Sequence, residues 1–170
     1  LEWLDESKDN LLWYKHGGEA TVIAYESVTL ETKKKHIEFL KSLEDFHLDE
    51  QHRLFVHAGF TNMNGVHYEY FPGLFYWDRT LWETALSFDI RMKPDHPFYP
   101  KRFTLYNESF IGHTPVSRIG KTTPVQKANV WNVDTGAAFK GPLTIMDVNT
   151  KEFWQSEPLN QLYFDEKGRN

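Results

Sequence analysis

The sequence predicts a mixed α/β fold in a single domain covering residues 1–170. Three patterns support this fold class. Apolar residues recur with helical spacing over 29–43, and two short apolar runs, at 53–57 and 110–111, are typical of buried strands. Closely spaced strands are predicted between 130 and 156. A chain of 170 residues with 40% apolar and 16% aromatic side chains is large enough to bury a core.

The first quarter of the chain predicts helix and loop. Residues 1–13 indicate the end of one helix and a turn into another element. The His-Gly-Gly sequence at 16–18 predicts a loop, because glycine adopts backbone angles that other residues avoid. The clearest helix is predicted over 29–43, with Thr29 at its start and an apolar stripe that includes Leu40.

The middle of the chain alternates strands with loops. After the strand at 53–57, residues 61–72 are rich in turn formers and aromatics and predict an excursion above the sheet. Residues 76–88 return to helical spacing, with Trp77 on the apolar side. Three prolines within 93–102 predict a loop.

The last third predicts strands joined by short connections. A connector is expected over 116–129, after the strand at 110–111. Strands are then predicted at the ranges 130–136, 141–148 and 151–156. Asn149-Thr150 predicts a tight turn, so the last two strands form an antiparallel hairpin. The polar tail 157–170 is expected on the surface.

The composition excludes several classes of function. The net charge is −5 without a basic patch, so nucleic acid is not expected as the primary partner. No apolar run approaches the roughly 20 residues of a membrane span. The chain has no cysteine, which excludes disulfides, thiolate metal sites and cysteine nucleophiles. This fits a reducing compartment and no signal-peptide pattern opens the chain, so we expect a cytoplasmic protein.

Two histidines lie at the ends of predicted strands. His57 lies in RLFVHAGF and His113 in SFIGHTPV. In α/β sheets ligands bind at the carboxyl ends of strands, and neutral imidazole is a common metal ligand. One interpretation is therefore a metal site. The other is a hydrogen-bonded, partly buried histidine without a ligand.

Arg79 is flanked by aromatic residues in YWDRT. Its planar guanidinium matches phosphate oxygens, which together with metal-bound histidines indicates phosphoryl chemistry. The alternative is a surface ion pair with Asp78. Among the other histidines, His16 and His67 are candidates to line a pocket, whereas the rest are expected in solvent. Neither a G-x-S-x-G nucleophile motif nor a G-x-x-x-x-G-K phosphate loop occurs in the sequence.

These motifs carry a resemblance to a known family. LFVHAGF, YWDRTLW, FIGHTPV and VWNVDTGAAFKGPLTIMDVNT follow in the order and spacing of the second half of calcineurin-like metallophosphoesterases. They look most like the bacterial serine/threonine phosphatase branch, which also includes the symmetrical dinucleoside tetraphosphatases. The resemblance covers about residues 1–156. It implies the C-terminal portion of a layered α/β/β/α sandwich of mixed sheets.

The resemblance also implies roles for individual residues. His57 and His113 match two ligands of the same ion in a pair of divalent metals (Mn, Fe or Zn). Arg79 matches the arginine that grips the phosphate and is the catalytic and substrate-binding candidate. His16 and Gly17 resemble a loop near the substrate mouth, and residues 134–136 match a structural D-T-G segment. In this family two metals activate a water that attacks phosphorus.

The sequence departs from the family at its start. The motifs G-D-x-H-G, G-D-x-x-D-R-G and G-N-H-[DE] are absent, and we expect them upstream of Leu1. The chain alone is then expected to be inactive unless another chain supplies them, and an exposed sheet edge is expected to favour association. Carboxylates that offer a weak mononuclear site instead are Glu69, Asp78, Asp134 and Asp147.

We therefore expect a metal-dependent phosphoesterase that acts on phosphomonoesters of the serine/threonine phosphoprotein type. One alternative is a dinucleoside polyphosphate hydrolase, and another is a hydrolase that uses a different chemistry on a nucleotide. A third is a non-catalytic binding module derived from a phosphatase, with the aromatic loop 66–77 as its contact surface.

Overall fold

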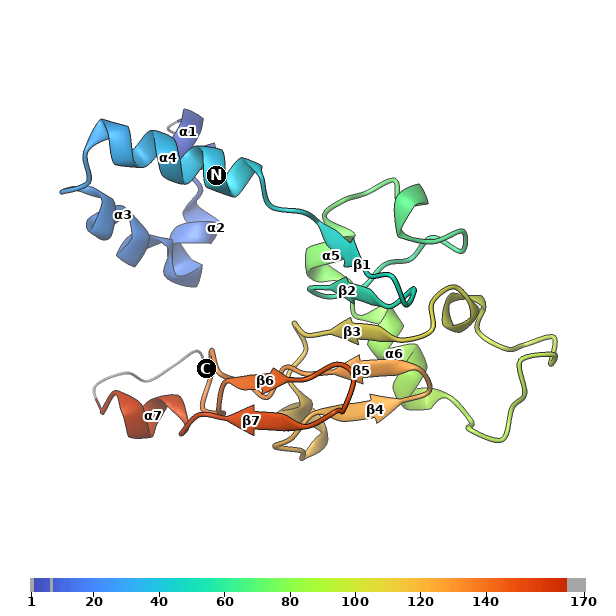
Figure 1. The fold of residues 1–170 in the computed structure, drawn as a ribbon. Helices are drawn as coiled ribbons and strands as arrows, with labels where there is room; N and C mark the ends of the chain where they lie inside the picture. The colour runs from blue at the N-terminus through green and yellow to red at the C-terminus, as the bar shows by residue number, and fades with distance from the viewer. Residues whose placement is uncertain (1, 7, 165–170) are drawn as a thin grey trace. The chain divides into compact units, whose positions relative to one another are not determined.

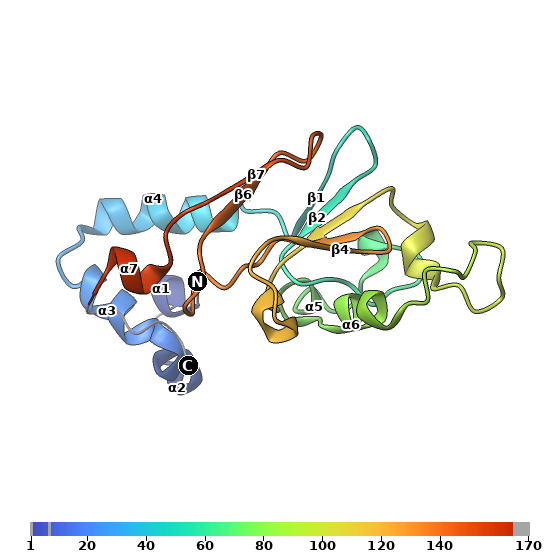
Figure 2. The same cartoon turned by 90° about the horizontal axis from the view of Figure 1, so that it is seen from below.

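The computed structural model of the chain describes residues 2–6 and 8–164. The chain divides into two compact units, residues 1–44 and 45–170. The described part of the first unit is helical, and both β-sheets belong to the second (Figures 1 and 2). The prediction of a single metallophosphoesterase domain stays a prediction, and each unit is described by itself.

The first unit contains four α-helices among its described residues. They are α1 (Glu2–Glu6), α2 (Leu11–Trp13), α3 (Glu19–Tyr25) and α4 (Leu30–Lys41). The Thr29 side chain accepts a hydrogen bond from the backbone N–H of Thr32 at 3.2 Å and so caps α4. The helix predicted over 29–43 is confirmed with that start. The sequence did not predict α3, because its seven residues, about two turns, are too few for the apolar spacing to stand out.

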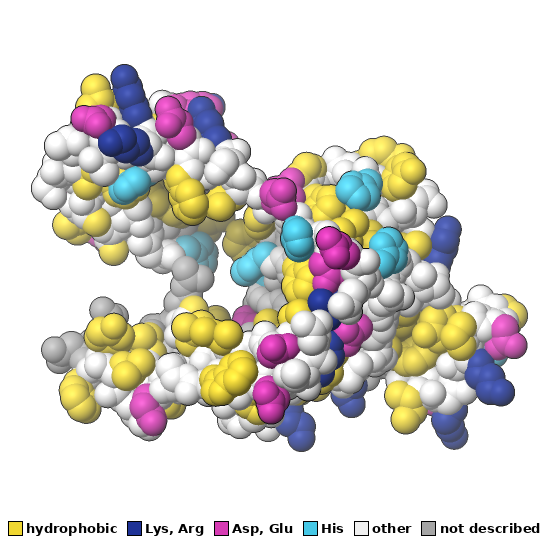
Figure 3. All heavy atoms as spheres, in the orientation of Figure 1, with side chains coloured by type: hydrophobic (Ala, Val, Ile, Leu, Met, Phe, Trp, Pro, Cys, Tyr) yellow, Lys and Arg dark blue, Asp and Glu magenta, His cyan; other side chains and the backbone are white. Residues whose placement is uncertain are grey.

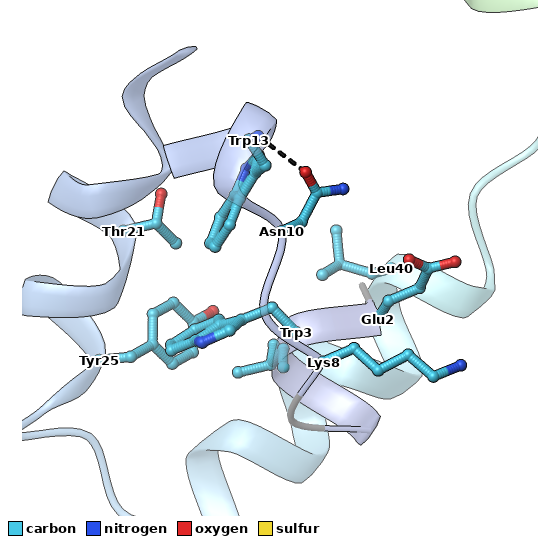
Figure 4. Close-up of a pocket in the computed structure, with 9 residues that line it drawn as sticks. Glu2, Trp3, Lys8, Asn10, Trp13, Thr21, Tyr25 and Leu40 are labelled. Carbon is cyan, nitrogen blue, oxygen red and sulfur yellow. Dashed lines mark hydrogen bonds between the residues drawn. The ribbon is translucent and has the colours of Figure 1, made fainter. Parts of the chain in front are cut away.

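Half-buried aromatic rings pack together in this unit (Figure 4). The ring centroids of Trp3 and Trp13 are 5.5 Å apart, and that of Tyr25 lies 6.1 Å from Trp3. They line a hollow of about 300 Å³. A Cβ at Gly18 would collide with the Trp13 ring, and Gly17 has φ +102°. The predicted loop at 16–18 is therefore a kinked π-helical turn (Tyr14–Gly18) that needs both glycines.

The second unit is built around a mixed five-stranded sheet of order β1-β2-β3-β5-β4. β2, β3 and β5 are parallel, while the edge strands β1 and β4 are antiparallel to their neighbours. The strands are β1 (Phe46–Leu48), β2 (Leu54–Val56), β3 (Ser109–Ile111), β4 (Val125–Lys127) and β5 (Val130–Asn132). The strands predicted at 53–57, 110–111 and 130–136 are confirmed; β2 and β5 are shorter than predicted, and β3 is one residue longer.

Helices cover one face of this sheet. α5 (Leu74–Trp77) and α6 (Thr80–Ser87) lie beneath it (Figure 2). Leu54 and Ile111 point from the sheet into a core that includes Trp82 of α6, and all three are at most 2% exposed. Burial of such side chains contributes about 1.5–3 kcal/mol each to folding. This core holds the strand ends in place.

An aromatic ladder covers the opposite face. The rings of Phe55, Phe110 and Trp131 stack from β2 to β3 to β5, with interplanar angles of 8°. The Lys151 ammonium lies 4.8 Å from the centre of the Phe110 ring and donates to Glu108 at 2.6 Å. The second, smaller sheet is the antiparallel pair β6 (Thr144–Met146) and β7 (Phe153–Gln155), which confirms the predicted hairpin. Lys151 belongs to the turn of this hairpin, so its contacts hold the turn over the aromatic ladder.

The helix predicted over 76–88 is wrong as a single element. The chain breaks between α5 and α6 because Asp78 is extended (φ −62°, ψ 141°). Its carboxylate accepts the backbone N–H groups of Thr80 and Leu81 and thereby starts α6. Trp77 was predicted on the apolar side, but it is 70% exposed. Helical periodicity alone cannot distinguish one helix from two whose apolar faces align.

The connector predicted over 116–129 joins β3 to β5 and itself contains the edge strand β4 and a 3-10 helix (Val116–Ile119), which the sequence did not predict. Further 3-10 helices are Val66–Tyr68, within the predicted aromatic loop, and Lys101–Thr104. In the tail, α7 spans Leu159–Leu162, and residues 165–170 lie outside the described part. The two sheets and flanking helices confirm a mixed α/β fold.

None of the helices in the described part of the chain has the length and apolar character needed to cross a membrane.

Asp78 also supports a buried arginine. Arg102 donates to the backbone oxygens of Phe60 and Thr80 at 2.7 and 3.1 Å, and its guanidinium lies 3.8 Å from the Asp78 carboxylate. We expect Asp78→Ala to lower the free energy of unfolding by about 2–4 kcal/mol, because it removes the helix cap and leaves a buried cation without its counter-ion. Urea denaturation followed by tryptophan fluorescence measures this. Asp95→Ala, at an exposed loop position, is the control; equal stability of the two variants would contradict the assignment.

Candidate functional site

His57 and His113 lie side by side at the carboxyl ends of two neighbouring parallel strands. β2 and β3 pair through Leu54 with Ser109 and Phe55 with Phe110. The pairing continues past the strands, because the N–H of Gly112 donates to the His57 carbonyl at 2.8 Å. His57 Nε2 is 3.2 Å from His113 Nδ1, and the ring centroids are 5.1 Å apart. Histidine side chains gather over β1 and β2 in Figure 3.

His113 has a strained backbone. Its φ is +65°, a region that side-chain-bearing residues seldom occupy. The surrounding chain holds it there: the N–H of Thr114 donates to Gly112 at 2.7 Å, and the fully buried Asn132 amide donates to the Thr114 carbonyl at 2.9 Å. Such strain persists only where neighbours impose it and is concentrated at functional sites.

The His57 segment is fixed against α5 and α6. The N–H of Ala58 donates to the Phe75 carbonyl at 2.8 Å. A Cβ at Gly59 would collide with the Asp78 carboxylate, so only glycine permits this approach. The Ala-Gly that follows His57 in the sequence thus allows this segment to pack closely against α5 and against Asp78, the residue before Arg79.

Charge and burial act together on His113. Burial lowers the pKa of its imidazole, and the positive charges of His57, Arg79 and Arg118 lower it further, while Asp134 opposes them. His113 Nε2 is buried and has no hydrogen-bond partner in the described part of the chain. The His113 ring therefore stays neutral at pH values below the ordinary pKa of histidine. The neutral ring is the form that binds a metal.

The pair of nitrogens fits one metal ion. Two nitrogens that each lie about 2.1 Å from an ion, with ligand angles of about 90–110°, are about 3.0–3.4 Å apart. The separation of 3.2 Å between His57 Nε2 and His113 Nδ1 falls within this range. It is also a hydrogen-bond distance between the two rings, so the geometry is compatible both with two ligands of one divalent ion and with the hydrogen-bonded interpretation.

Carboxylates do not complete this site within the described residues, where no group of three or more metal-binding side chains is found. Asp78 and Glu69 accept backbone N–H groups, from Leu81 at 3.0 Å and from Thr61 at 2.7 Å. Asp147 accepts in the same way from Asn149 within the β6–β7 turn. Asp134, the fourth carboxylate considered, accepts the Gly136 N–H at 2.9 Å, and its charge acts on His113. A mononuclear site completed by these carboxylates is not found among the described residues.

Arg79 lies at the junction of α5 and α6 with an exposed side chain, and its charge acts on His113. The surface ion pair with Asp78 that we considered is not found: Asp78 is 4% exposed and is engaged by α6 and Arg102. The Trp77 ring meets the His113 ring edge-on at 5.4 Å. Sequence reasoning did not assign Trp77 to the site, because its spacing matched a buried helix face.

His16 and Gly17 belong to the first unit, whose position relative to the histidine pair is not determined. Their role in binding substrate stays a prediction, and the kinked turn already explains Gly17. The charges of Asp134 and Arg118 act on His113. Arg118 was not predicted as a site residue, and Asp134 was considered only as a carboxylate of the alternative mononuclear site. Asp134 lies two residues after β5, as His113 lies two residues after β3, so the same strand-end signal applies to it.

No protein-family model matches this chain, and no curated protein matches it.

Removal of either imidazole should weaken metal binding. We expect the chain to bind one Zn²⁺ and expect His57→Ala or His113→Gly to reduce the affinity at least about tenfold. Glycine is chosen at 113 because it adopts a positive φ without strain. Isothermal titration calorimetry measures the affinity, and His96→Ala, in an exposed loop, is the control. Unchanged affinity in both variants would remove the two histidines from a metal site.

Stability should depend on the protonation of His113. Because its pKa is lowered in the folded chain, the unfolded chain binds a proton first as the pH falls below about 6.5. The free energy of unfolding should therefore decrease from pH 7 toward pH 5, and His113→Gly should make this decrease smaller. Urea denaturation at pH 7.0 and 5.5 tests the difference. A variant with the same pH dependence as the original chain would contradict the assignment.

Proposed function

We propose that this chain carries part of the active site of a metal-dependent phosphoesterase, with His57 and His113 as ligands of one divalent ion and Arg79 as the phosphate-binding group. The observation that supports this most directly is the 3.2 Å approach of the two ring nitrogens at adjacent strand ends. The resemblance to calcineurin-like metallophosphoesterases implies the same pair. Manganese, iron and zinc all accept imidazole ligands.

A divalent ion bound there would act as a Lewis acid and lower the pKa of water near the phosphate. The residues of this chain supply position and charge. His57 and His113 each present a ring nitrogen, and the lowered pKa of His113 keeps its lone pair available near neutral pH. Arg79 presents a planar fork of N–H donors to the phosphoryl oxygens. In the overall reaction water adds to phosphorus, the P–O ester bond breaks, and the alcohol leaves with a proton.

The substrate class we favour is a phosphomonoester of the serine or threonine phosphoprotein type, with a dinucleoside polyphosphate as the alternative within the same chemistry. The exposed position of Arg79 and of His57 suits a substrate that approaches from the surface. The layered α/β/β/α sandwich belongs to the same proposal: the aromatic ladder and the β6–β7 sheet above it support two stacked sheets.

One observation favours a non-catalytic binding module. The loop 66–77 exposes large aromatic side chains, with Tyr70 83%, Phe71 70% and Trp77 70% exposed. Such a surface is typical of a protein contact. The zinc titration separates the two functions, because a binding module has no need of a stoichiometric ion at the histidines.

Arg79 provides the direct test of phosphoester chemistry. In the complete protein encoded by the reading frame, assayed with Mn²⁺ and p-nitrophenyl phosphate, Arg79→Met should lower kcat/KM about 30–100-fold, because a charge-assisted hydrogen bond to the phosphate is lost. Arg79→Lys should retain part of the activity. Arg91→Met is the matched control, since Arg91 is exposed and pairs with Asp89 at 2.8 Å. Activity that survives Arg79→Met unchanged would contradict the proposed role.

A further inference from the structure

A second concave site opens close to the histidine pair. It is a cavity of about 690 Å³ within the unit 45–170, between the segment after His113 and the loop after β5. Pro115 lines the cavity and follows His113 by two residues. Two residues of extended chain span at most about 7 Å, so the cavity begins within that distance of the His113 backbone.

The charge of this cavity is opposite to that of the chain. Arg118, Lys121 and Lys140 line it, and none of its lining residues is Asp or Glu, although the net charge of the chain is −5. None of the three side chains forms an ion pair or hydrogen bond within the described residues. Three unpaired cations from two different segments thus converge on one hollow, which favours an anionic occupant.

The wall that carries Lys140 is held in a fixed shape. The N–H groups of Phe139 and Gly141 both donate to the Gly136 carbonyl at 2.9 Å. A Cβ at Gly141 would collide with the Thr135 carbonyl, and the Thr135 hydroxyl, which is almost fully buried, donates to Pro142 at 2.7 Å. A preformed wall lowers the entropic cost of binding, so the loop is suited to a specific ligand.

The two sites are electrostatically connected. Arg118 lines the cavity, and its charge also acts on His113. Because Pro115 lines the same cavity and follows His113 by two residues, an anion bound there would lie near the His113 end of the proposed site. A volume of this size accommodates a phosphorylated small molecule.

We propose that this cavity binds a second phosphate group, so that the preferred phosphoprotein substrates carry two phosphorylated residues close together. The position of the reacting phosphate rests on the proposed function, whereas the binding of the second phosphate rests on the cavity alone. One phosphate would lie at His57, His113 and Arg79, and the other would be held by Lys121 and Lys140.

Binding of inorganic tripolyphosphate to the metal-free chain tests the cavity. We expect measurable binding by calorimetry, weakened by added salt, and at least a tenfold loss of affinity in the double variant Lys121→Glu/Lys140→Glu. The matched control is Lys93→Glu/Lys127→Glu, which changes the net charge equally at exposed positions outside the cavity. Its affinity should stay within about twofold of the original chain.

Equal losses in the two double variants, or no binding, would overturn the inference. Equally tight binding of an unphosphorylated acidic peptide would overturn it too, because the cavity would then recognise carboxylates and not phosphate. Failure of the proposed function is visible separately: tripolyphosphate would still bind in the cavity, while Zn²⁺ titration would show no dependence on His57 or His113.

Discussion

The site depends on the parallel pairing of β2 with β3. This pairing continues beyond the strands through the hydrogen bond from Gly112 to the His57 carbonyl. Because parallel strands in register end at the same edge of a sheet, the residues that follow them are brought together. His57 and His113, 56 positions apart in sequence, therefore meet at 3.2 Å. A slip of one residue would turn one imidazole to the other face of the sheet.

Buried polar groups hold the rest of the site against this edge. Arg102 connects the carbonyl of Phe60, three residues after His57, with Thr80, next to Arg79. Asp78 lies close to Arg102 and starts α6, and Gly59 leaves space for its carboxylate. Removal of one partner from such a buried network is costly, because it leaves another polar group unsatisfied. The position of Arg79 is thus coupled to that of His57 through the protein interior.

The proposed metal site and the proposed phosphate site have different electrostatic requirements. A metal ligand must be neutral, and the positive groups around His113 favour its neutral form. The same positive groups attract phosphate but repel a divalent cation, so the phosphate and the metal place opposite demands on them. Glu69, Asp78 and Asp147 accept backbone hydrogen bonds, whereas Asp134 is the carboxylate whose charge opposes the positive groups at His113.

The sequence by itself determined the local features. Thr29 marked the start of α4, and the short apolar runs marked β2, β3 and β5, because caps and strand patterns depend on neighbouring residues. It also identified His57, His113 and Arg79 as candidates, from strand ends and from the family resemblance. The roles inferred from that resemblance stay predictions.

Only the tertiary structure decided which of these residues meet. It separated α5 from α6, placed Trp77 against His113, and gathered Arg118, Lys121 and Lys140 into one cavity. The sequence showed no basic patch there, because Lys140 is far along the chain from the other two. Contacts between distant segments depend on sheet register and on buried hydrogen bonds, and a pattern of neighbouring residues contains neither.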